Sequence, residues 1–344
     1  MAAASPFAPS DELAELHAHL GGSVPPHVLW EIAHLQGIAL PTKDYWEFVD
    51  LTSISDPRGV DGLTGLDRIY HLTELIQSSP LAVERSVYGM VGGGYRSQRI
   101  TTSEVRFNPM KRNRGGERDL DHTILAAIHA LDIAELAYPQ VHAGLILMMD
   151  RTFSSEQNAI IVDKAIRYAP RGVVGVDIAG PRPSPGRYPY RGLEEHVRTA
   201  RDAGLGVTIH VGEEGFADEI GEVVEHLRPD RIGHGILAAG DPELVGLLRD
   251  TGTVLEICPT SNLLTGALGD DEEVVRVFRT FLEGGVAVTV STDGPEMMRT
   301  HLRDEFEFLC RIGALQPDEA RAANATAHAV RFGAPGRPSR RRGT

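Results

Sequence analysis

The sequence predicts a (β/α)8 barrel, a TIM-type α/β fold in which parallel strands alternate with helices. Two observations lead to this prediction. Eight short β-rich segments recur along the chain, and longer segments of helical composition separate them. The chain also has 344 residues, 42% of them hydrophobic, which is enough for a large buried core.

The elements can be assigned in order along the chain. The predicted strands are 14–19, 102–107, 142–149, 173–178, 206–211, 231–233, 253–257 and 286–291. Predicted helices between them include 120–136, which is rich in alanine and leucine, and 193–203 and 242–250, each of which precedes a glycine. This spacing is typical of a parallel barrel whose strands are buried under a ring of helices.

The first β/α unit is longer than the others. Residues 25–98 contain several helical stretches and a loop expected around 44–62. Extra chain after the first strand usually covers the C-terminal mouth of a barrel, where active sites of this fold lie. We therefore predict one barrel domain over residues 1–333 with additional helices over its mouth. Residues 334–344 are expected to form a disordered basic tail.

Composition excludes several classes of protein. The net charge of −14 argues against nucleic-acid binding. We expect no secretory signal, because the first residues lack a charged region followed by an apolar core, and no apolar run approaches the roughly 18 residues of a membrane span. The two cysteines, Cys258 and Cys310, form no Cys-x-x-Cys motif. We expect a cytoplasmic protein without a membrane partner, and the sequence specifies no oligomeric state.

Polar side chains gather where the predicted strands end. The first strand ends in His17-Ala18-His19, and side chains two apart on a strand share one face. His210 ends the fifth strand, and Asp293 follows the eighth. Three imidazoles and one carboxylate suit zinc, so we predict one Zn²⁺ per chain on these four residues. Iron or another divalent ion is compatible with the same ligands.

Three further roles complete a hydrolytic site. Zinc lowers the pKa of a bound water toward neutrality. Asp293 can accept the proton of that water, and His234, at the end of the sixth strand, can orient it. Glu213, just beyond the fifth strand, can carry a proton to a ring nitrogen of the substrate. The pattern indicates metal-assisted hydrolysis at an electrophilic carbon.

The joint pattern resembles the adenosine deaminase family of metal-dependent hydrolases over about residues 12–333. The motifs that carry the resemblance are His17-Ala18-His19-Leu20, Val176-Asp177-Ile178-Ala179-Gly180, His210-Val211-Gly212-Glu213, Arg231-Ile232-Gly233-His234-Gly235, Cys258-Pro259-Thr260-Ser261-Asn262 and Ser291-Thr292-Asp293. The resemblance implies a zinc-bearing barrel that removes the 6-amino group of a small-molecule purine and releases ammonia. It further implies that Glu213 protonates purine N1 and that the Gly180 backbone contacts the purine.

Two positions depart from the family's pattern. Gly21 stands where the family has an aspartate that accepts a hydrogen bond from the ribose 5′-hydroxyl. Gly294 stands where it has an aspartate that contacts purine N7. Losing a buried acceptor typically costs about 1–3 kcal/mol, so unmodified adenosine is not expected to be the best substrate.

A basic loop after the second strand indicates which kind of substrate the protein prefers over adenosine. This loop holds Lys111, Arg112 and Arg114 at the predicted barrel mouth. Such cations can hold a phosphate or carboxylate, which favours a substrate with an anionic or bulky group at the 5′ position. The alternative is a solvated basic loop without a ligand.

Two other functions stay open from the sequence. The same metal site can serve an aminohydrolase of another aminated heterocycle or an amide. A binding protein that has lost activity is disfavoured, because all the predicted ligands and both proton carriers are present. Cys258 and Asn262 are expected to brace the mouth of the barrel.

Overall fold

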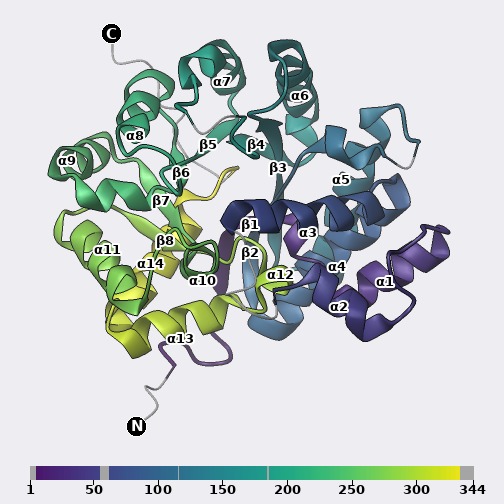
Figure 1. Ribbon diagram of the computed structural model, residues 1–344, viewed down its shortest axis with the longest axis horizontal. Helices are drawn as coiled ribbons and strands as arrows, with labels where there is room; N and C mark the ends of the chain where they lie inside the picture. The colour runs from purple at the N-terminus through teal and green to yellow at the C-terminus, as the bar shows by residue number, and fades with distance from the viewer. Residues whose placement is uncertain (1–4, 55–61, 115, 184–185, 334–344) are drawn as a thin grey trace.

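Eight parallel strands form the centre of the molecule, in the order β1 to β8 (Figure 1). The computed structural model describes residues 5–54, 62–114, 116–183 and 186–333. The strands are β1 Leu13–His19, β2 Ile100–Phe107, β3 His142–Asp150, β4 Val173–Ala179, β5 Gly206–Val211, β6 Arg231–His234, β7 Val254–Ile257 and β8 Val288–Val290. Every predicted strand coincides with one of these to within two residues at either end, which confirms the barrel.

The barrel closes where β1 meets the chain after β8. Ala18 and Asp293 form a parallel bridge. The His19 amide donates to the Asp293 carbonyl at 2.7 Å, and the Asp293 amide donates to the His17 carbonyl at 2.8 Å. These bonds place three of the predicted metal ligands at a single junction.

A ring of helices covers the outside of the barrel (Figure 1). The longer ones are α5 Leu120–Ala137, α6 Ser155–Tyr168, α7 Glu194–Asp202, α9 Pro242–Thr251, α11 Asp271–Glu283, α13 Leu302–Ile312 and α14 Pro317–Val330. Shorter helices are α8 Asp218–Glu222, α10 Pro259–Leu264 and α12 Pro295–Met298. Single turns are η1 Leu20–Gly22, η3 Pro109–Arg112, η4 Ala169–Arg171, η5 Tyr190–Leu193, η6 Val223–Leu227 and η7 Ile236–Gly240. No helix in the described ranges is both long enough and apolar enough to cross a membrane.

The long first unit contains four helices. They are α1 Pro26–Leu35, α2 Tyr45–Thr52, α3 Gly62–Ile76 and α4 Pro80–Gln98. The prediction of a loop around 44–62 was wrong for its first half: the Asp44 carboxylate accepts from the amides of Trp46 and Glu47 and so begins α2. Helix α3 contacts η1 and η3 at the ends of β1 and β2, so it covers the mouth as expected. The predicted tail, 334–344, lies outside the described residues.

Phe332 closes the opposite, N-terminal end of the barrel. A Cβ atom on Gly206 would lie 2.1 Å from its ring, and one on Gly175 would lie 2.6 Å from it. The Arg231 guanidinium carbon lies 3.6 Å from the ring centroid. The Phe332 ring therefore fills the base of the barrel, at the end opposite the predicted site.

Candidate active site

The predicted functional side chains meet at the C-terminal mouth of the barrel. His17 and His19 come from β1, His210 from β5 and His234 from β6, while Asp293 follows β8. His234 and Asp293 have φ angles of 61° and 64°. The other non-glycine residues with positive φ in the described chain end helices, whereas these two lie in the site. Strained backbone of this kind is concentrated at functional sites.

Four of these side chains direct ligand atoms at one point. His19 Nε2 lies 3.1 Å from His210 Nε2 and 3.3 Å from Asp293 Oδ1. His17 Nε2 lies 3.9 Å from the same oxygen. Ligands about 2 Å from a tetrahedral zinc ion lie roughly 3.3 Å from one another. The separations therefore fit a metal ion held between the four residues.

The protonation state of the three imidazoles also fits metal binding. Burial lowers the pKa of His17, His19 and His210 well below its usual value, so all three rings are neutral at pH 7. His17 Nε2 is buried and has no hydrogen-bond partner among the described residues. A buried lone pair without a partner is costly, and a metal ion would satisfy it.

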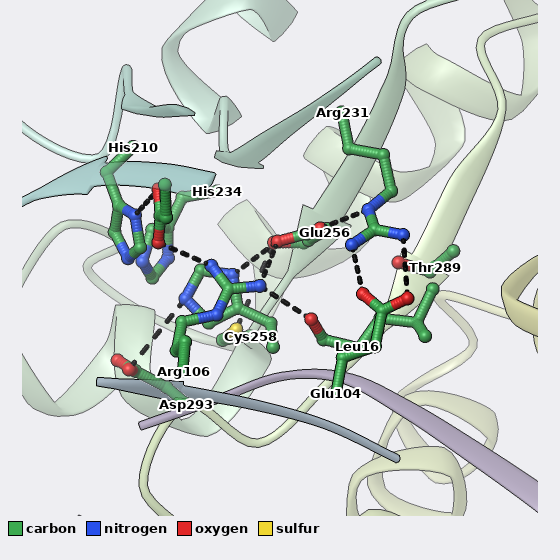
Figure 2. A network of polar contacts seen from close by, with 12 residues as sticks. Leu16, Glu104, Arg106, His210, Arg231, His234, Glu256, Cys258, Thr289 and Asp293 are labelled. Atoms are coloured by element: carbon green, nitrogen blue, oxygen red, sulfur yellow. Dashed lines mark hydrogen bonds and ion pairs between the residues drawn. The ribbon is translucent and has the colours of Figure 1, made fainter. Parts of the chain in front are cut away.

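Buried carboxylates behind the ligands set which nitrogen faces the metal position. His17 Nδ1 lies 2.8 Å from Glu256 Oε2, and His210 Nδ1 lies 3.1 Å from Asp177 Oδ1. A carboxylate only accepts, so each Nδ1 carries the proton and each Nε2 keeps its lone pair. Arg106 bridges both carboxylates, at 2.9 Å from Asp177 and 2.8 Å from Glu256. Figure 2 shows Arg106 beside Glu256.

His234 is held in the opposite tautomer. The Asn262 side-chain amide donates to His234 Nδ1 at 2.9 Å. The ring proton therefore lies on Nε2, which is 3.4 Å from Glu213 Oε2. Asn262 thus holds a side chain at the mouth of the barrel, in line with its expected bracing role. His234 Nε2 carries a proton and can donate a hydrogen bond, so it offers no lone pair to a metal ion.

Glu213 has the properties of a proton donor. Burial, and after it the neighbouring Glu214, raises the pKa of Glu213 to about 7. The Thr265 hydroxyl lies 3.5 Å from its Oε1. A carboxyl group that is partly protonated at neutral pH can give a proton to a substrate and take it back.

A cavity of about 350 Å³ opens above these groups. Gly21, Gly180, Lys111 and Arg112 line it, together with residues of α3. Gly294 does not line it: a Cβ atom on this residue would lie 3.2 Å from Gly22 Cα, because the two backbones pack together. Four of the five predicted substrate-binding residues are thus in the cavity wall.

The cations of the predicted anion-binding loop already have acidic neighbours. Lys111 Nζ lies 2.6 Å from Asp150 Oδ2, and Arg112 Nη1 lies 3.0 Å from Glu74 Oε1. Arg114 lies 3.8 Å from the same Glu74 side chain. The loop is a paired cluster of charges in the cavity wall and not a bare basic patch.

Comparison with known proteins assigns the family. The sequence profile described as adenosine deaminase matches residues 12–340. The chain belongs to the adenosine deaminase family. It is therefore a hydrolase of the C–N bond that deaminates 6-aminopurines, in a family whose members bind a metal.

One curated relative supports this family assignment, and two solved structures share the fold. The chain is 30% identical to adenosine deaminase from Shewanella denitrificans over 86% of each sequence. Its fold matches the crystal structure of adenine deaminase from Arthrobacter aurescens with a TM-score of 0.84, 23% identity and 96% of each chain covered. It also matches the Arabidopsis N6-mAMP deaminase with a TM-score of 0.79, 23% identity and 95% of each chain covered.

Several residues of this adenosine deaminase-family site had no role assigned from the sequence, although Asp177 and Ser261 lie in the quoted motifs. Glu256, Asp177 and Arg106 support the histidines from inside the barrel, and the Ser261 hydroxyl donates to Asp293 Oδ2 at 2.7 Å. Arg151 donates to the carbonyls of Gly180 and His210, at 2.6 Å in both cases. Charged residues within otherwise apolar strands, as at positions 106, 177 and 256, were the available signal.

Proposed function

We propose that this chain is a zinc-dependent deaminase of an adenosine-type nucleoside that carries an anionic or bulky group at its 5′ position. The observation that carries the proposal is the convergence of His17, His19, His210 and Asp293 beside the proton donor Glu213 in one cavity. Nitrogen and carboxylate ligands in this combination favour zinc over harder ions. When bound, zinc would supply a water activated for attack at neutral pH.

The proposed reaction uses three proton-handling side chains. Glu213 gives its proton to purine N1, which makes C6 more electrophilic. Asp293 takes a proton from the attacking water, and its second oxygen is held by the Ser261 hydroxyl. The Nε2–H of His234 faces the same space and can donate to the attacking oxygen.

The atoms balance for hydrolytic deamination. Water adds its oxygen to C6, and the C6–N bond to the amino group breaks. The water proton taken by Asp293 passes to the amino group, which leaves as ammonia. The proton from Glu213 stays on N1, and Glu213 recovers the second water proton from the C6 hydroxyl as the carbonyl forms. The product is a 6-oxopurine, and no oxidant or second substrate is needed.

The surroundings of Gly21 support the anionic substituent. Arg112 Nη2 lies 3.5 Å from the position that a Cβ atom on Gly21 would occupy. The Arg112 side chain is buried, and its Nε has no hydrogen-bond partner in the described part of the chain. The family's aspartate at this position is thus absent, the Tyr70 ring lies against Gly21, and a guanidinium borders the same part of the cavity wall, which suits an acceptor brought by the substrate.

A kinetic panel tests the proposal. Purified, zinc-loaded protein would be assayed for ammonia with adenine, adenosine, AMP, a 5′-carboxylated deoxyadenosine, an aminated pterin and an aminated pyrimidine. We expect an anionic nucleoside to have the highest kcat/KM, and Arg112→Gln to lower it about tenfold or more while changing adenosine little. If adenosine were the best substrate by a wide margin, the proposal that the substrate carries an anionic 5′ group would be wrong. If only a pterin or a pyrimidine released ammonia, the proposal that the substrate is a purine would be wrong.

A further inference from the structure

Buried charges connect the metal ligand His17 with the base of the barrel. The Nδ1 atom of His17 lies 2.8 Å from one oxygen of Glu256, and the other oxygen of Glu256 lies 2.5 Å from Arg231 Nε. Arg231 forms a second ion pair with Glu104, as Figure 2 shows. Each of these three charged side chains is almost fully buried. The series Glu256, Arg231 and Glu104 forms an interior charge chain that runs from the metal site down the inside of the barrel.

The lower end of the interior charge chain is held by residues 330–332. Arg231 Nη1 donates to the Val330 carbonyl at 2.9 Å, and the Phe332 amide donates to Glu104 Oε1. The Phe332 ring packs on the Arg231 guanidinium and on the glycines at the base of the barrel. The positions of Arg231 and Glu104 are therefore set at the end of the barrel opposite the metal site.

The interior charge chain occupies space that apolar side chains normally fill. In (β/α)8 barrels, branched apolar residues pack in layers inside the strands. Here Glu104 and Arg106, two residues apart on β2, both place charges inside the barrel. A buried ion pair adds little net stability, because the lost hydration offsets the attraction between the charges. An apolar layer could fill this space but could not orient a carboxylate toward a metal ligand.

The contacts of Glu256 show what the interior charge chain can position. Its Oε2 lies 2.8 Å from both His17 Nδ1 and Arg106 Nη2, while its Oε1 lies against Arg231. A carboxylate that is held at both oxygens is kept from rotating away from the imidazole. The Arg231 guanidinium is a planar fork, so partners on both of its sides fix its place. Glu104 supplies the charged partner on the side away from Glu256.

We propose that Glu104 and Arg231 are positioning residues for the metal site, because they hold Glu256 in the orientation that fixes the tautomer of His17. The affinity for the metal ion is then set partly at the base of the barrel. This inference rests on the zinc site of the proposed function. Neither Glu104 nor Arg231 is among the described residues that line the cavity, so their effect passes through Glu256.

A double-mutant cycle on zinc affinity tests this dependence. Glu104→Gln keeps the shape of the side chain and removes its charge. We expect it to weaken zinc binding about 3- to 10-fold in the otherwise native protein, measured by competition with a chelator. In the Glu256→Gln background the same substitution should change the affinity by less than about twofold, because the route from Glu104 to His17 is already broken there.

Glu219→Gln is the matched control. Glu219 of α8 is also buried, pairs with Arg182 and accepts from the Tyr188 amide, so its substitution removes the same kinds of contact. It should change zinc affinity by less than about twofold in either background. Urea denaturation of the metal-free variants reports any loss of stability separately.

A second variant covers the case in which Glu104→Gln does not fold. Arg231→Lys then takes its place in the cycle, because lysine keeps the charge but lacks the fork that joins Glu256 to Glu104. We expect the same pattern, with a loss of zinc affinity in the native background that is absent from the Glu256→Gln background.

The outcomes separate the two proposals. An equal loss of zinc affinity in both backgrounds, or no loss in the native background, would overturn the positioning role and leave the zinc site intact. A wild-type protein that binds no zinc would instead overturn the zinc-dependent function proposed above.

Discussion

The Nδ1 atom of His17 lies 2.8 Å from Glu256 Oε2, inside the barrel and away from solvent. Glu256 is shared: Arg106 and Arg231 contact its two oxygens from either side (Figure 2). Burial alone would raise the pKa of Glu256, but the two guanidinium groups lower it below its usual value. The carboxylate therefore stays ionised and fixes the tautomer of a metal ligand.

Replacing Glu256 with glutamine should weaken metal binding. The amide keeps the shape but no longer provides a charged acceptor for His17 Nδ1–H, and it leaves two arginines with less compensation. We expect zinc affinity to fall about 10- to 100-fold, measured by competition with a chelator. Glu272→Gln, on the exposed side of α11, is the control. Unchanged zinc affinity in a folded Glu256→Gln protein would contradict the tautomer-fixing role.

Glu213 should give the reaction an alkaline limb. Its pKa of about 7 means that the carboxyl group is protonated below that pH and ionised above it. Only the protonated form can supply a proton to N1, so kcat/KM should fall as pH rises through about 7. Glu213→Gln should lose turnover and still bind zinc. Substantial turnover by this variant, or a rate that keeps rising to pH 9, would exclude Glu213 as the donor.

Phe332 should be a large contributor to stability although it lies far from the cavity. It is 4% exposed and packs on the glycines at the base of the barrel. Phe332→Ala should lower the free energy of unfolding by about 3–5 kcal/mol, measured by urea denaturation. Phe216→Ala, at a half-exposed position, should cost much less. A cost below about 1 kcal/mol for Phe332→Ala would show that the base is not sealed by this ring.

The strands and the main site residues could be predicted because they leave local signals. Short β-rich runs mark the strands, and histidines at strand ends share one mouth in any parallel barrel. The start of α2 was missed because the signal is a single capping carboxylate, Asp44, before an otherwise ambiguous segment.

The supporting contacts could not be predicted because they depend on three-dimensional neighbours. The His17–Glu256 contact joins residues 239 positions apart. The partners of Lys111 and Arg112 come from β3 and α3, so sequence alone could not show that these cations are paired. The position of Tyr70 against Gly21 likewise depends on how α3 lies over the mouth.

Deamination of a 6-aminopurine by this protein should require a metal ion held by His17, His19, His210 and Asp293. The most direct test of this requirement is ammonia release by protein stripped of metal and then titrated with zinc. We predict no turnover by the stripped protein, and full recovery at one equivalent of zinc per chain. Full turnover by metal-free protein in the presence of a chelator would contradict this metal requirement.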